Sequence, residues 1–516
     1  MTDVIVIGAG HNGLSCAAYL ARAGKQVLCL EASASVGGMS APHQFGDHYT
    51  LPGLPVSSYP LSKNIRKELQ LNKFGYQAGK AIDTHVLDKA GNHLSIRGEQ
   101  VEGANLSESD RQAFPEFIQR YHFFAKALQP FFDRQPPRLI DMDRLDKKTL
   151  LRLGWNLRVG LGRDAMYEFL RVAAINIYDV LNDTFEHELL KSYLANEAIM
   201  GSAMGPRTPG SVLSWLHRLQ GALNGPRGHF TNAESGLIQA LQASAEDAGV
   251  TIQCNSRVKQ LLIEDDRAVG VELENGSTIH AELVVSSADP RNTFLQLVGA
   301  GKLDAMFANR IEQIRGNGVV AKLHLALNGL PAVPGLDTQE LNGRFLIAPS
   351  MRHIERAFNH AKYGEYSEQA VIEFTLPTAV QADLAPNGQH ILSANVAYAP
   401  HDLAGGWAQH KEQFTEQLIT QLDEVMPGLA SQVVARELLT PADIESRYSV
   451  MQGHWHHAEL SIHQSMMMRP VYGAAQYSTP IDNLYLCGAG CHPGGDLNSL
   501  AGHNAAKRIL QSGAFK

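Results

Sequence analysis

Two apolar runs, one near each end of the chain, lead directly into glycines. Near the N-terminus, Val4–Ile7 is a continuous apolar run that is typical of a strand buried on both faces. The stretch "LSCAAYLARAGKQV" then predicts a helix that ends at Gly24, and "QVLCLEA" predicts a second strand that ends at Glu31. Near the C-terminus, "NLYLCGAG" predicts another buried strand, and "LNSLAGHNAAKRIL" predicts a helix after it. The pattern at both ends is typical of an α/β fold.

The middle of the chain contains stretches with different periodicities. Residues 236–290 predict a helix, a strand that ends at Val258, a hairpin through "ENGS" and a strand that ends at Ser287. Residues 76–224 are helical in pattern, whereas residues 301–464 contain alternating stretches such as "VVAKLHLALNG". We therefore expect two interleaved domains, one from 1–75, 225–300 and 465–516 and the other from 76–224 and 301–464.

Composition narrows the class of protein. The chain has 516 residues, more than one hydrophobic core usually supports, and 44% of them are hydrophobic and 19% charged, as in ordinary globular proteins. A net charge of -8 and the lack of a basic cluster argue against nucleic acid as a partner. The five cysteines form no C-x-x-C pair, and no run of about 18 apolar residues exists. We expect an intracellular protein, cytoplasmic or peripheral to a membrane.

The first glycine turn carries the chemistry of a dinucleotide site. Gly8, Gly10 and Gly13 follow the first strand and open the first helix, and Glu31 ends the second strand. Glycines let the backbone approach a pyrophosphate, the helix N-terminus donates N–H groups to it, and a carboxylate at this place accepts from a ribose hydroxyl. The complete context of two strands, a helix and an acid favours this interpretation over an ordinary tight turn.

A second glycine pair indicates which dinucleotide is bound. Gly37 and Gly38 follow Glu31 closely, and this arrangement resembles flavoproteins of the amine oxidase and phytoene desaturase type. Many of those proteins have an arginine after the glycines, where this chain has Met39. The resemblance implies a Rossmann-like FAD-binding domain interleaved with an α+β substrate domain. It implies that FAD contacts Gly8, Gly10, His11, Asn12, Gly13, Glu31, Ala32, Gly37, Gly38, Met39, Ser40, Val258, Gly488, Ala489, Asp496, Leu497 and Asn498.

The segment "CGAGCHPGGD" at residues 487–496 makes the resemblance more specific. It is similar to a segment of the phytoene desaturase and carotenoid oxidoreductase family. The stretches "TPGSVLSWLHRLQGAL", "LLTPADIESRY" and "HHAELSIHQSMMMRPV" resemble one branch of that family, the proteins labelled pyridine nucleotide-disulphide oxidoreductase domain-containing. The resemblance implies that the last helix points its N-terminal amides at the flavin pyrimidine, where negative charge collects on reduction.

Three side chains are candidates for catalysis, and each has an ordinary structural alternative. His492 lies beside the flavin by motif, His457 aligns with a histidine of the family, and Asp496 stands where the family has a small residue. His492 and His457 could instead be hydrogen-bonded core histidines, and Asp496 could cap the last helix. In "GHWHHAE" no cysteine or carboxylate at ligand spacing completes a metal set, so we predict no metal site. Arg469 could hold a cofactor oxygen or form an ion pair.

These features predict an FAD-dependent oxidoreductase that takes a hydride from a largely apolar small-molecule substrate to flavin N5. The chain has one strand-anchored G-x-G-x-x-G, so we expect dioxygen or a quinone to reoxidise the flavin rather than a nicotinamide nucleotide. Two alternatives stay open: amine oxidase-like C–N oxidation, and a non-catalytic flavin-containing binding or assembly protein. The mixed apolar and basic stretch "KKTLLRLGWNLRVGLGR" allows peripheral membrane contact as well as an ordinary solvated face.

Overall fold

The strands of the two chain ends lie in one parallel sheet. The computed structural model describes residues 2–230 and 236–515. Its five-stranded sheet has the order β10-β2-β1-β14-β20, and all neighbouring strands are parallel. These strands are β1 (Val4–Ile7), β2 (Val27–Leu30), β10 (Thr251–Gln253), β14 (Leu283–Ser286) and β20 (Leu484–Leu486). The continuous apolar runs are buried on both faces, as parallel strands require.

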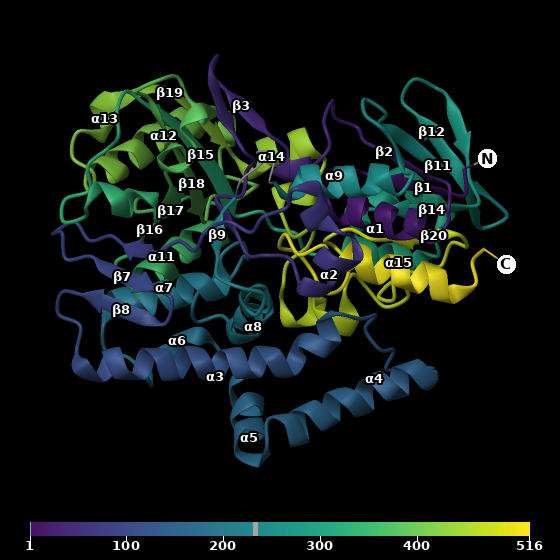
Figure 1. Ribbon diagram of the computed structural model, residues 1–516, viewed down its shortest axis with the longest axis horizontal. Coiled ribbons are helices and arrows are strands. Elements are labelled where there is room, and N and C mark those ends of the chain that lie inside the picture. The colour runs from purple at the N-terminus through teal and green to yellow at the C-terminus, as the bar shows by residue number, and fades with distance from the viewer. Residues whose placement is uncertain (1, 231–235, 516) are drawn as a thin grey trace.

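Three helices pack beside this sheet, near both chain termini (Figure 1). They are α1 (His11–Arg22), α9 (Leu237–Asp247) and α15 (Leu500–Ser512). Helices α1 and α15 approach each other so closely that a Cβ added at Gly502 would lie 2.1 Å from the carbonyl oxygen of Asn12. The first and last helices of the chain therefore form one packed unit.

The predicted hairpin is present, but one predicted strand boundary is wrong. Strands β11 (Val258–Glu264), β12 (Arg267–Leu273) and β13 (Thr278–His280) form a small antiparallel sheet, and "ENGS" connects β12 to β13. Val258 was expected to end a strand, whereas β10 ends at Gln253 and Val258 opens β11. The four residues "CNSR" at 254–257 separate β10 from β11, and an apolar pattern alone does not mark so short a break.

The second sheet is mixed and has eight strands in the order β19-β15-β18-β17-β16-β6-β7-β8. Its members from the first intervening segment are β6 (Thr84–Val86), β7 (Leu94–Arg97) and β8 (Gln100–Gly103). Those from the second are β15 (Val320–Leu327), β16 (Arg344–Ile347), β17 (Val371–Thr375), β18 (His390–Ala397) and β19 (Val433–Leu439). The helical pattern predicted for 76–224 overlooked β6–β8, because strands this short show too few alternations. The domain boundaries stay a prediction, and residues 231–235 within them lie outside the described part.

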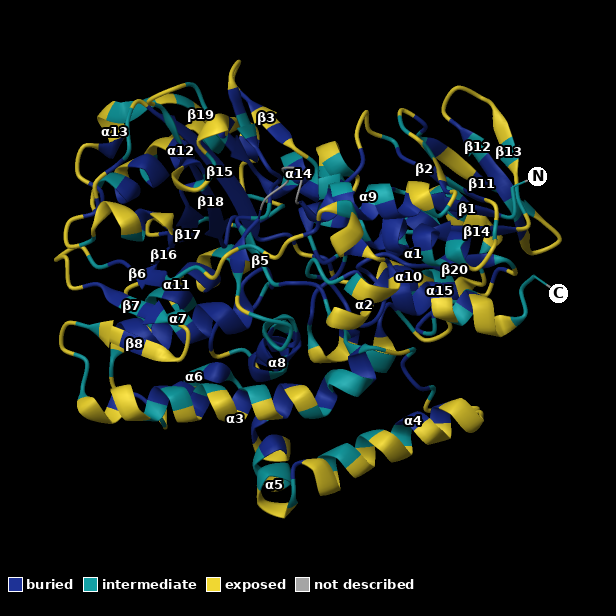
Figure 2. Ribbon diagram, viewed as in Figure 1, coloured by how far each residue is buried: buried dark blue, intermediate teal, exposed yellow. Residues whose placement is uncertain are grey.

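Helices form a layer along one side of the molecule (Figure 1). They include α3 (Glu108–Phe132), α4 (Arg144–Trp155), α5 (Arg163–Val172), α6 (Ile177–Asn182), α7 (Glu188–Ile199) and α8 (Ser211–Ala222). Helices α4 and α5 stand away from the rest and carry many exposed residues (Figure 2). Within residues 2–230 and 236–515, no helix combines the length and the apolar character needed to cross a bilayer.

Candidate functional site

The first glycine turn is tied to Glu31 by backbone hydrogen bonds. One carboxylate oxygen of Glu31 accepts from the Ala9 N–H at 2.8 Å, and the other accepts from the Ser33 N–H at 2.9 Å. Each oxygen keeps a further lone pair that can accept from a ribose hydroxyl. A Cβ added at Gly13 would lie 1.9 Å from the Gly8 carbonyl oxygen. Gly13 therefore permits the close contact between strand and helix on which the turn depends.

Gly10 differs from Gly13 in what surrounds it. A Cβ added at Gly10 would meet no atom within 4 Å. Gly10 is bridged to Gly37, whose N–H donates to the Ala9 carbonyl at 2.9 Å, so the two glycine turns lie side by side. Gly10 is also the N-cap residue of α1 and makes no side-chain cap. Among residues 2–230 and 236–515, no side chain therefore caps the first N–H groups of α1, and the space beside Gly10 is open.

The last helix begins next to the first one. Ser499, the N-cap residue of α15, donates from its hydroxyl to the His11 carbonyl at 3.4 Å, and the Gly502 N–H donates to Asn12 Oδ1 at 3.4 Å. The N-termini of α1 and α15 therefore meet at one place, where two sets of backbone amides concentrate positive potential.

The loop between β20 and α15 is held by close backbone contacts. A Cβ added at Gly488 would lie 2.3 Å from the Ser287 carbonyl oxygen. Asp496 was an alternative cap for the last helix, but that alternative is wrong, because Asn498 Oδ1 accepts from the Leu500 N–H at 2.9 Å and α15 begins only there. Asp496 and its neighbours Leu497 and Asn498 are half-buried. The Asp496 carboxylate is thus free of a capping role.

Comparison with known proteins decides what this geometry holds. The sequence profile described as "Flavin containing amine oxidoreductase" matches residues 13–510. The chain belongs to the flavin-containing amine oxidoreductase family. It is 32% identical to pyridine nucleotide-disulfide oxidoreductase domain-containing protein 2 of Mus musculus, covering 99% of this chain and 93% of the mouse protein.

Two further relatives lie at greater distance. The chain is 24% identical to a lycopene-forming phytoene desaturase of Pseudescherichia vulneris, covering 99% of each chain. Its fold resembles that of an oxidoreductase from Methanosarcina mazei with a TM-score of 0.63 at 16% identity, covering 99% of this chain and 100% of the other. The predicted family, the Rossmann-like FAD-binding fold and FAD as the cofactor are therefore confirmed, and the protein is an FAD oxidoreductase.

The residues present fit FAD at the junction of the two chain ends. Gly8, Gly10, His11 and Gly38 are half-buried although they adjoin a fully buried sheet, which is the exposure expected of a surface that a cofactor covers. The His11 ring has a buried Nε2 that finds no hydrogen-bond partner among the described residues. An FAD-dependent family member would place its pyrophosphate at the bare N-terminus of α1 and its flavin toward the loop before α15.

Met39 and Val258, two of the predicted FAD contacts, also have packing and hydrogen-bonding neighbours that the glycine motifs do not predict. Met39 packs its side chain against the apolar cluster of Leu54, Leu439, Ile444 and Val450, so it links the second glycine turn to the second sheet. Val258 lies two residues after Ser256, whose N–H donates to the Glu31 carbonyl at 2.8 Å, so Val258 lies near Glu31. The individual contacts with FAD, including those of Ala32, Ser40 and Ala489, stay predictions.

A shell of histidines surrounds the loop before α15. Burial lowers the pKa of His217 to about 4 and the pKa values of His454 and His492 to about 3, and it lowers that of His456 well below its usual range. His217 Nε2 contacts the Pro493 carbonyl at 3.1 Å, and His492 Nε2 contacts the Phe131 carbonyl at 3.1 Å. These imidazoles are therefore neutral at pH 7.

His11 and His457 belong to the same shell but are half-buried. Burial lowers the pKa of His11 to about 4, against the opposing effect of the Asp496 backbone and charge, and it lowers the pKa of His457 to about 3. Asp496 also raises the pKa of His217 by its charge. The three candidate catalytic residues therefore lie around one loop, and their catalytic roles stay predictions.

The neutral histidines predict that the folded protein loses stability in weak acid. Because His217, His454 and His492 have folded pKa values of about 4, 3 and 3, the unfolded chain binds more protons below its ordinary histidine pKa of about 6.5. The stabilising contribution of these histidines to the free energy of unfolding is complete above pH 6.5. It is lost as the pH falls toward their pKa values in the folded protein. Between pH 7.5 and 5.5 the loss is at most about 1.4 kcal/mol for each histidine.

Urea unfolding of the FAD-loaded protein at the two pH values measures this loss. The variant His454→Gln should reduce the difference by about one histidine's share. The variant His360→Asn, at an exposed histidine of α11 (Met351–Lys362), should leave it unchanged. Equal unfolding free energies at pH 7.5 and 5.5 would contradict the buried neutral state.

Arg469 is hydrogen-bonded to backbone carbonyls of the "GHWHHAE" segment and of the loop before α15. The buried Arg469 guanidinium donates to the carbonyls of His456 at 2.6 Å, Glu459 at 2.8 Å and Ala489 at 2.9 Å, so it ties the histidine segment to the loop before α15. These hydrogen bonds account for the buried position of Arg469 without an ion pair or a cofactor oxygen. Burial lowers its pKa to about 10.

A row of buried charges on the second sheet has no counterpart among the sequence predictions. Lys322 of β15 donates to Asn395 Oδ1 at 2.6 Å, and Arg344 of β16 pairs with Glu197 of α7 at 2.7 Å and with Glu373 of β17 at 3.5 Å. Burial lowers the pKa of Lys322 to about 7 and raises that of Glu373. A charged residue within an alternating strand reads as solvent-facing in the sequence, so no local signal identified this face.

Proposed function

We propose that this protein is an FAD-dependent dehydrogenase of the desaturase type, which removes a hydride and a proton from adjacent carbon atoms of a largely apolar substrate. FAD, when bound, accepts the hydride at N5 and passes the electrons to dioxygen or a quinone-like acceptor. The loss of both hydrogens leaves a carbon–carbon double bond in the substrate. The relative from Pseudescherichia vulneris, a phytoene desaturase by name, supports this reaction class.

The surroundings of the loop before α15 are the observation that carries the proposal. Its neighbours are imidazoles kept neutral by burial together with the phenyl rings of Phe131 and Phe132, which lie 5.0 and 5.9 Å from the His492 ring. Apart from the Asp496 carboxylate and the buried Arg469, the groups around this loop are neutral imidazoles and phenyl rings, which suit a largely apolar substrate.

The released proton needs an acceptor made by the chain. Asp496 is half-buried and interacts by charge with His11 and His217, so it can take up a proton and share it with a neutral imidazole. We assign Asp496 this role, with His457 and the fully buried His492 supporting the loop. A charged carboxylate at this place also disfavours extra negative charge on the reduced cofactor.

Amine oxidase-like C–N oxidation is the second candidate, and the arrangement of rings favours it less. Two parallel aromatic rings flanking the flavin would support it. The Phe131 and Phe132 rings that pack here lie 6.5 Å apart at 74°, so they form an edge-to-face pair rather than two walls. The family itself includes enzymes of both kinds by name.

The choice of electron acceptor rests on where glycine-rich turns lie. The first turn follows β1 in the parallel sheet, as a dinucleotide site requires. "GLGRDAM" at residues 160–166 instead lies in the helical layer, where Gly162 is the N-cap residue of α5. It does not follow a strand and therefore offers no support for a nicotinamide nucleotide site.

The helices α4 and α5 suggest how an apolar substrate reaches the protein. Leu151 and Trp155 of α4 are 75% and 67% exposed, and Val159, Tyr167 and Leu170 are exposed hydrophobic residues of the same segment. The same segment exposes the basic residues Arg144, Lys147, Lys148, Arg152, Arg158 and Arg163. Apolar side chains flanked by basic ones match an anionic membrane surface, which we propose as the partner of α4 and α5.

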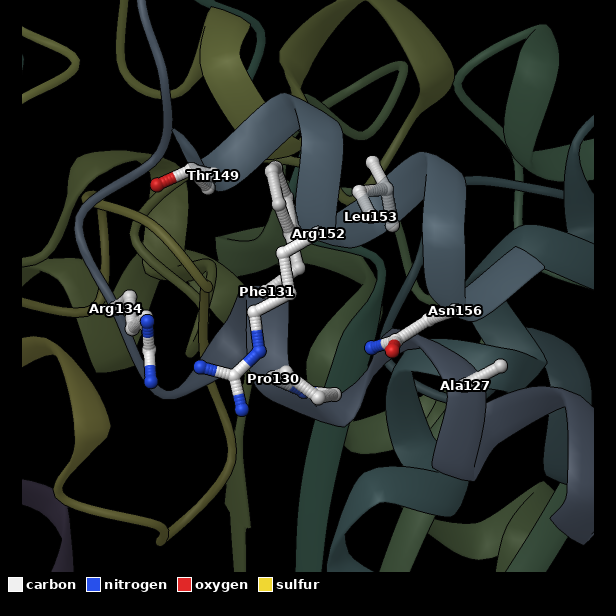
Figure 3. Close-up of a pocket in the computed structure, with 8 residues that line it drawn as sticks. All are labelled: Ala127, Pro130, Phe131, Arg134, Thr149, Arg152, Leu153 and Asn156. Atoms are coloured by element: carbon white, nitrogen blue, oxygen red, sulfur yellow. The ribbon is translucent and has the colours of Figure 1, made fainter. Parts of the chain in front are cut away.

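A cleft of about 540 Å³ lies between α4 and α15. Its lining is mostly polar and charged, and Ile65, Leu145 and Leu500 are among its few apolar members. Figure 3 shows the narrow cavity that adjoins it between the end of α3 and α4, where Phe131 and Leu153 lie with Arg134 and Arg152. Because the Phe131 carbonyl contacts His492, this cavity is one residue layer away from the loop before α15.

Vesicle binding tests the membrane contact. The double variant Lys147→Glu/Lys148→Glu should bind phosphatidylserine-containing vesicles at least roughly tenfold more weakly, since each basic residue near an anionic surface contributes about 1 kcal/mol. Leu151→Ala/Trp155→Ala should weaken binding to neutral and anionic vesicles alike. Tyr363→Ala, which removes another exposed aromatic ring, is the control and should bind like the unmodified protein. Equal binding by all variants would overturn the proposed contact.

A substrate panel under anaerobic conditions tests the reaction itself. Isoprenoid and terpene alkenes should bleach the flavin absorption band, whereas primary and secondary amines should not. Bleaching by amines alone would support the second candidate. No bleaching by any member of the panel would favour a binding or assembly protein that retains FAD for structure.

A further inference from the structure

Three side chains that are far apart in the sequence meet at the edge of the second sheet. They are His43 of β3 (His43–Phe45), His324 of β15 and Glu437 of β19. One candidate ligand atom from each lies within 4.8 Å of the other two. His43 Nε2 and Glu437 Oε2 are 2.5 Å apart. Neither the family match nor the motifs of the sequence assign a role to this cluster.

The fold holds these side chains in place. His324 and Glu437 are directly opposite each other in the antiparallel pair of β15 and β19, so their side chains share one face. His43 and Phe45 point inward from β3, and the Phe45 ring lies 5.7 Å from the His324 ring. The cluster is therefore built on three strands rather than on loops.

His324 gives independent evidence that the cluster takes a ligand. Its side chain is fully buried, and neither Nδ1 nor Nε2 finds a hydrogen-bond partner among the described residues. His43 Nδ1 is likewise buried and unpartnered. A buried polar atom without a partner destabilises the fold, and a metal ion that accepts the imidazole lone pair would remove part of this cost.

Both oxygens of Glu437 have neighbours in the cluster, and a bound ion would replace the proton shared between Glu437 and His43. Arg447 Nη1 lies 3.9 Å from Glu437 Oε1, and the other oxygen, Oε2, faces His43. Lys322 lies on the same face of β15, but its ammonium group binds Asn395 of β18, on the side of β15 opposite to β19. The Lys322 ammonium is thus bound away from Glu437, although its charge and that of Arg447 act on His324.

We propose that His43, His324 and Glu437 bind a divalent ion of the zinc class. Two imidazoles and one carboxylate are ligands that zinc prefers, and water would complete a tetrahedral set, since the Glu437 side chain is 24% exposed. Such an ion would fasten β3 to the edge of the second sheet. Because His43 follows Ser40 by three residues, the ion would also hold the second glycine turn near that sheet. The proposal replaces the prediction of no metal site, which considered only the histidines of "GHWHHAE".

Metal analysis of the FAD-loaded full-length protein tests the site. After treatment with a chelator, the protein is dialysed against zinc ions and its bound zinc is measured by elemental analysis. We expect one zinc ion per chain and a higher midpoint of thermal unfolding with zinc than without it. Glu437→Gln, which keeps the shape of the side chain, and His324→Leu should each weaken zinc binding by more than the roughly 10- to 100-fold that loss of an outer-shell partner causes.

The control is His401→Gln, because His401 contacts the carboxylates of Asp402 and Glu445 without a second imidazole nearby. It should retain zinc fully. Absence of bound zinc in the unmodified protein, equal zinc content in all variants, or loss of zinc in the control as well would each overturn the proposal. If His324→Leu fails to fold, Glu437→Gln alone decides between these outcomes. FAD content is measured in each sample, so that loss of the cofactor is distinguished from loss of zinc.

Discussion

Replacing Gly10 by Val should give a folded protein that no longer binds FAD. The backbone at Gly10 has φ −71° and ψ 173°, which a β-branched residue adopts readily, and a Cβ there meets no protein atom within 4 Å. The open space lies at the N-terminus of α1, where a pyrophosphate must approach the bare backbone. The valine methyl groups would occupy that space. We expect FAD affinity to fall at least about a hundredfold, or roughly 2.7 kcal/mol.

The measurement is the ratio of flavin to protein after purification, followed by titration of the variant with FAD. Gly154→Val is the matched control, because a Cβ at Gly154 also meets nothing within 4 Å but lies on α4, far along the chain from either glycine turn. It should purify with a full complement of flavin. If Gly10→Val retains FAD at the level of the control, the cofactor does not lie against the first turn.

Replacing Gly502 by Val should damage folding and FAD binding together. The added Cβ would lie 2.1 Å from the Asn12 carbonyl oxygen, so α15 must move away from α1. Overpacking of this kind typically costs about 1–3 kcal/mol of stability, and the separation would pull apart the two helix N-termini that face the cofactor. The two ends of the chain would then no longer share one site.

Thermal unfolding and flavin content, measured on the same samples, test this expectation. Gly502→Ala already places a Cβ at the contact and should show a smaller loss of both quantities than the valine variant. Comparing Gly502→Val with Gly10→Val separates the two effects more clearly. Gly10→Val should lose FAD but unfold at a temperature near that of the unmodified protein without FAD, whereas Gly502→Val should also unfold at a lower temperature. A Gly502→Val protein that is as stable and as yellow as the unmodified one would show that the contact between α1 and α15 is unimportant.

Local motifs made part of the fold and of the site predictable from the sequence. Gly8, Gly13 and Glu31 lie within one strand, helix and strand unit, and each has a backbone conformation or contact that accounts for its identity. Gly10 lies in the same unit but is restricted by no protein atom, so only the predicted cofactor accounts for it. The same holds for Gly488, where close approach to Ser287 excludes a side chain. Short-range geometry of this kind leaves a signature in consecutive residues.

Features that depend on distant segments were not predictable in this way. Asp496 was a plausible cap from its position, but Asn498 accepts the hydrogen bond because the chain turns once more before α15 begins. Strands β6–β8 become strands because they pair along an edge of the second sheet, not because of a strong alternation of their own. The pairing of Arg344 with Glu197 joins residues from different segments, and no spacing rule connects them.

Rapid anaerobic mixing of the FAD-loaded protein with different electron donors tests the central claim most directly. The absorption of the oxidised flavin is followed after mixing with an isoprenoid alkene, with an amine and with NADPH. We predict reduction by the alkene, followed by reoxidation on addition of a quinone or dioxygen, and no reduction by NADPH at a rate compatible with turnover. Rapid reduction by NADPH, without reduction by the alkene, would contradict the proposed dehydrogenase.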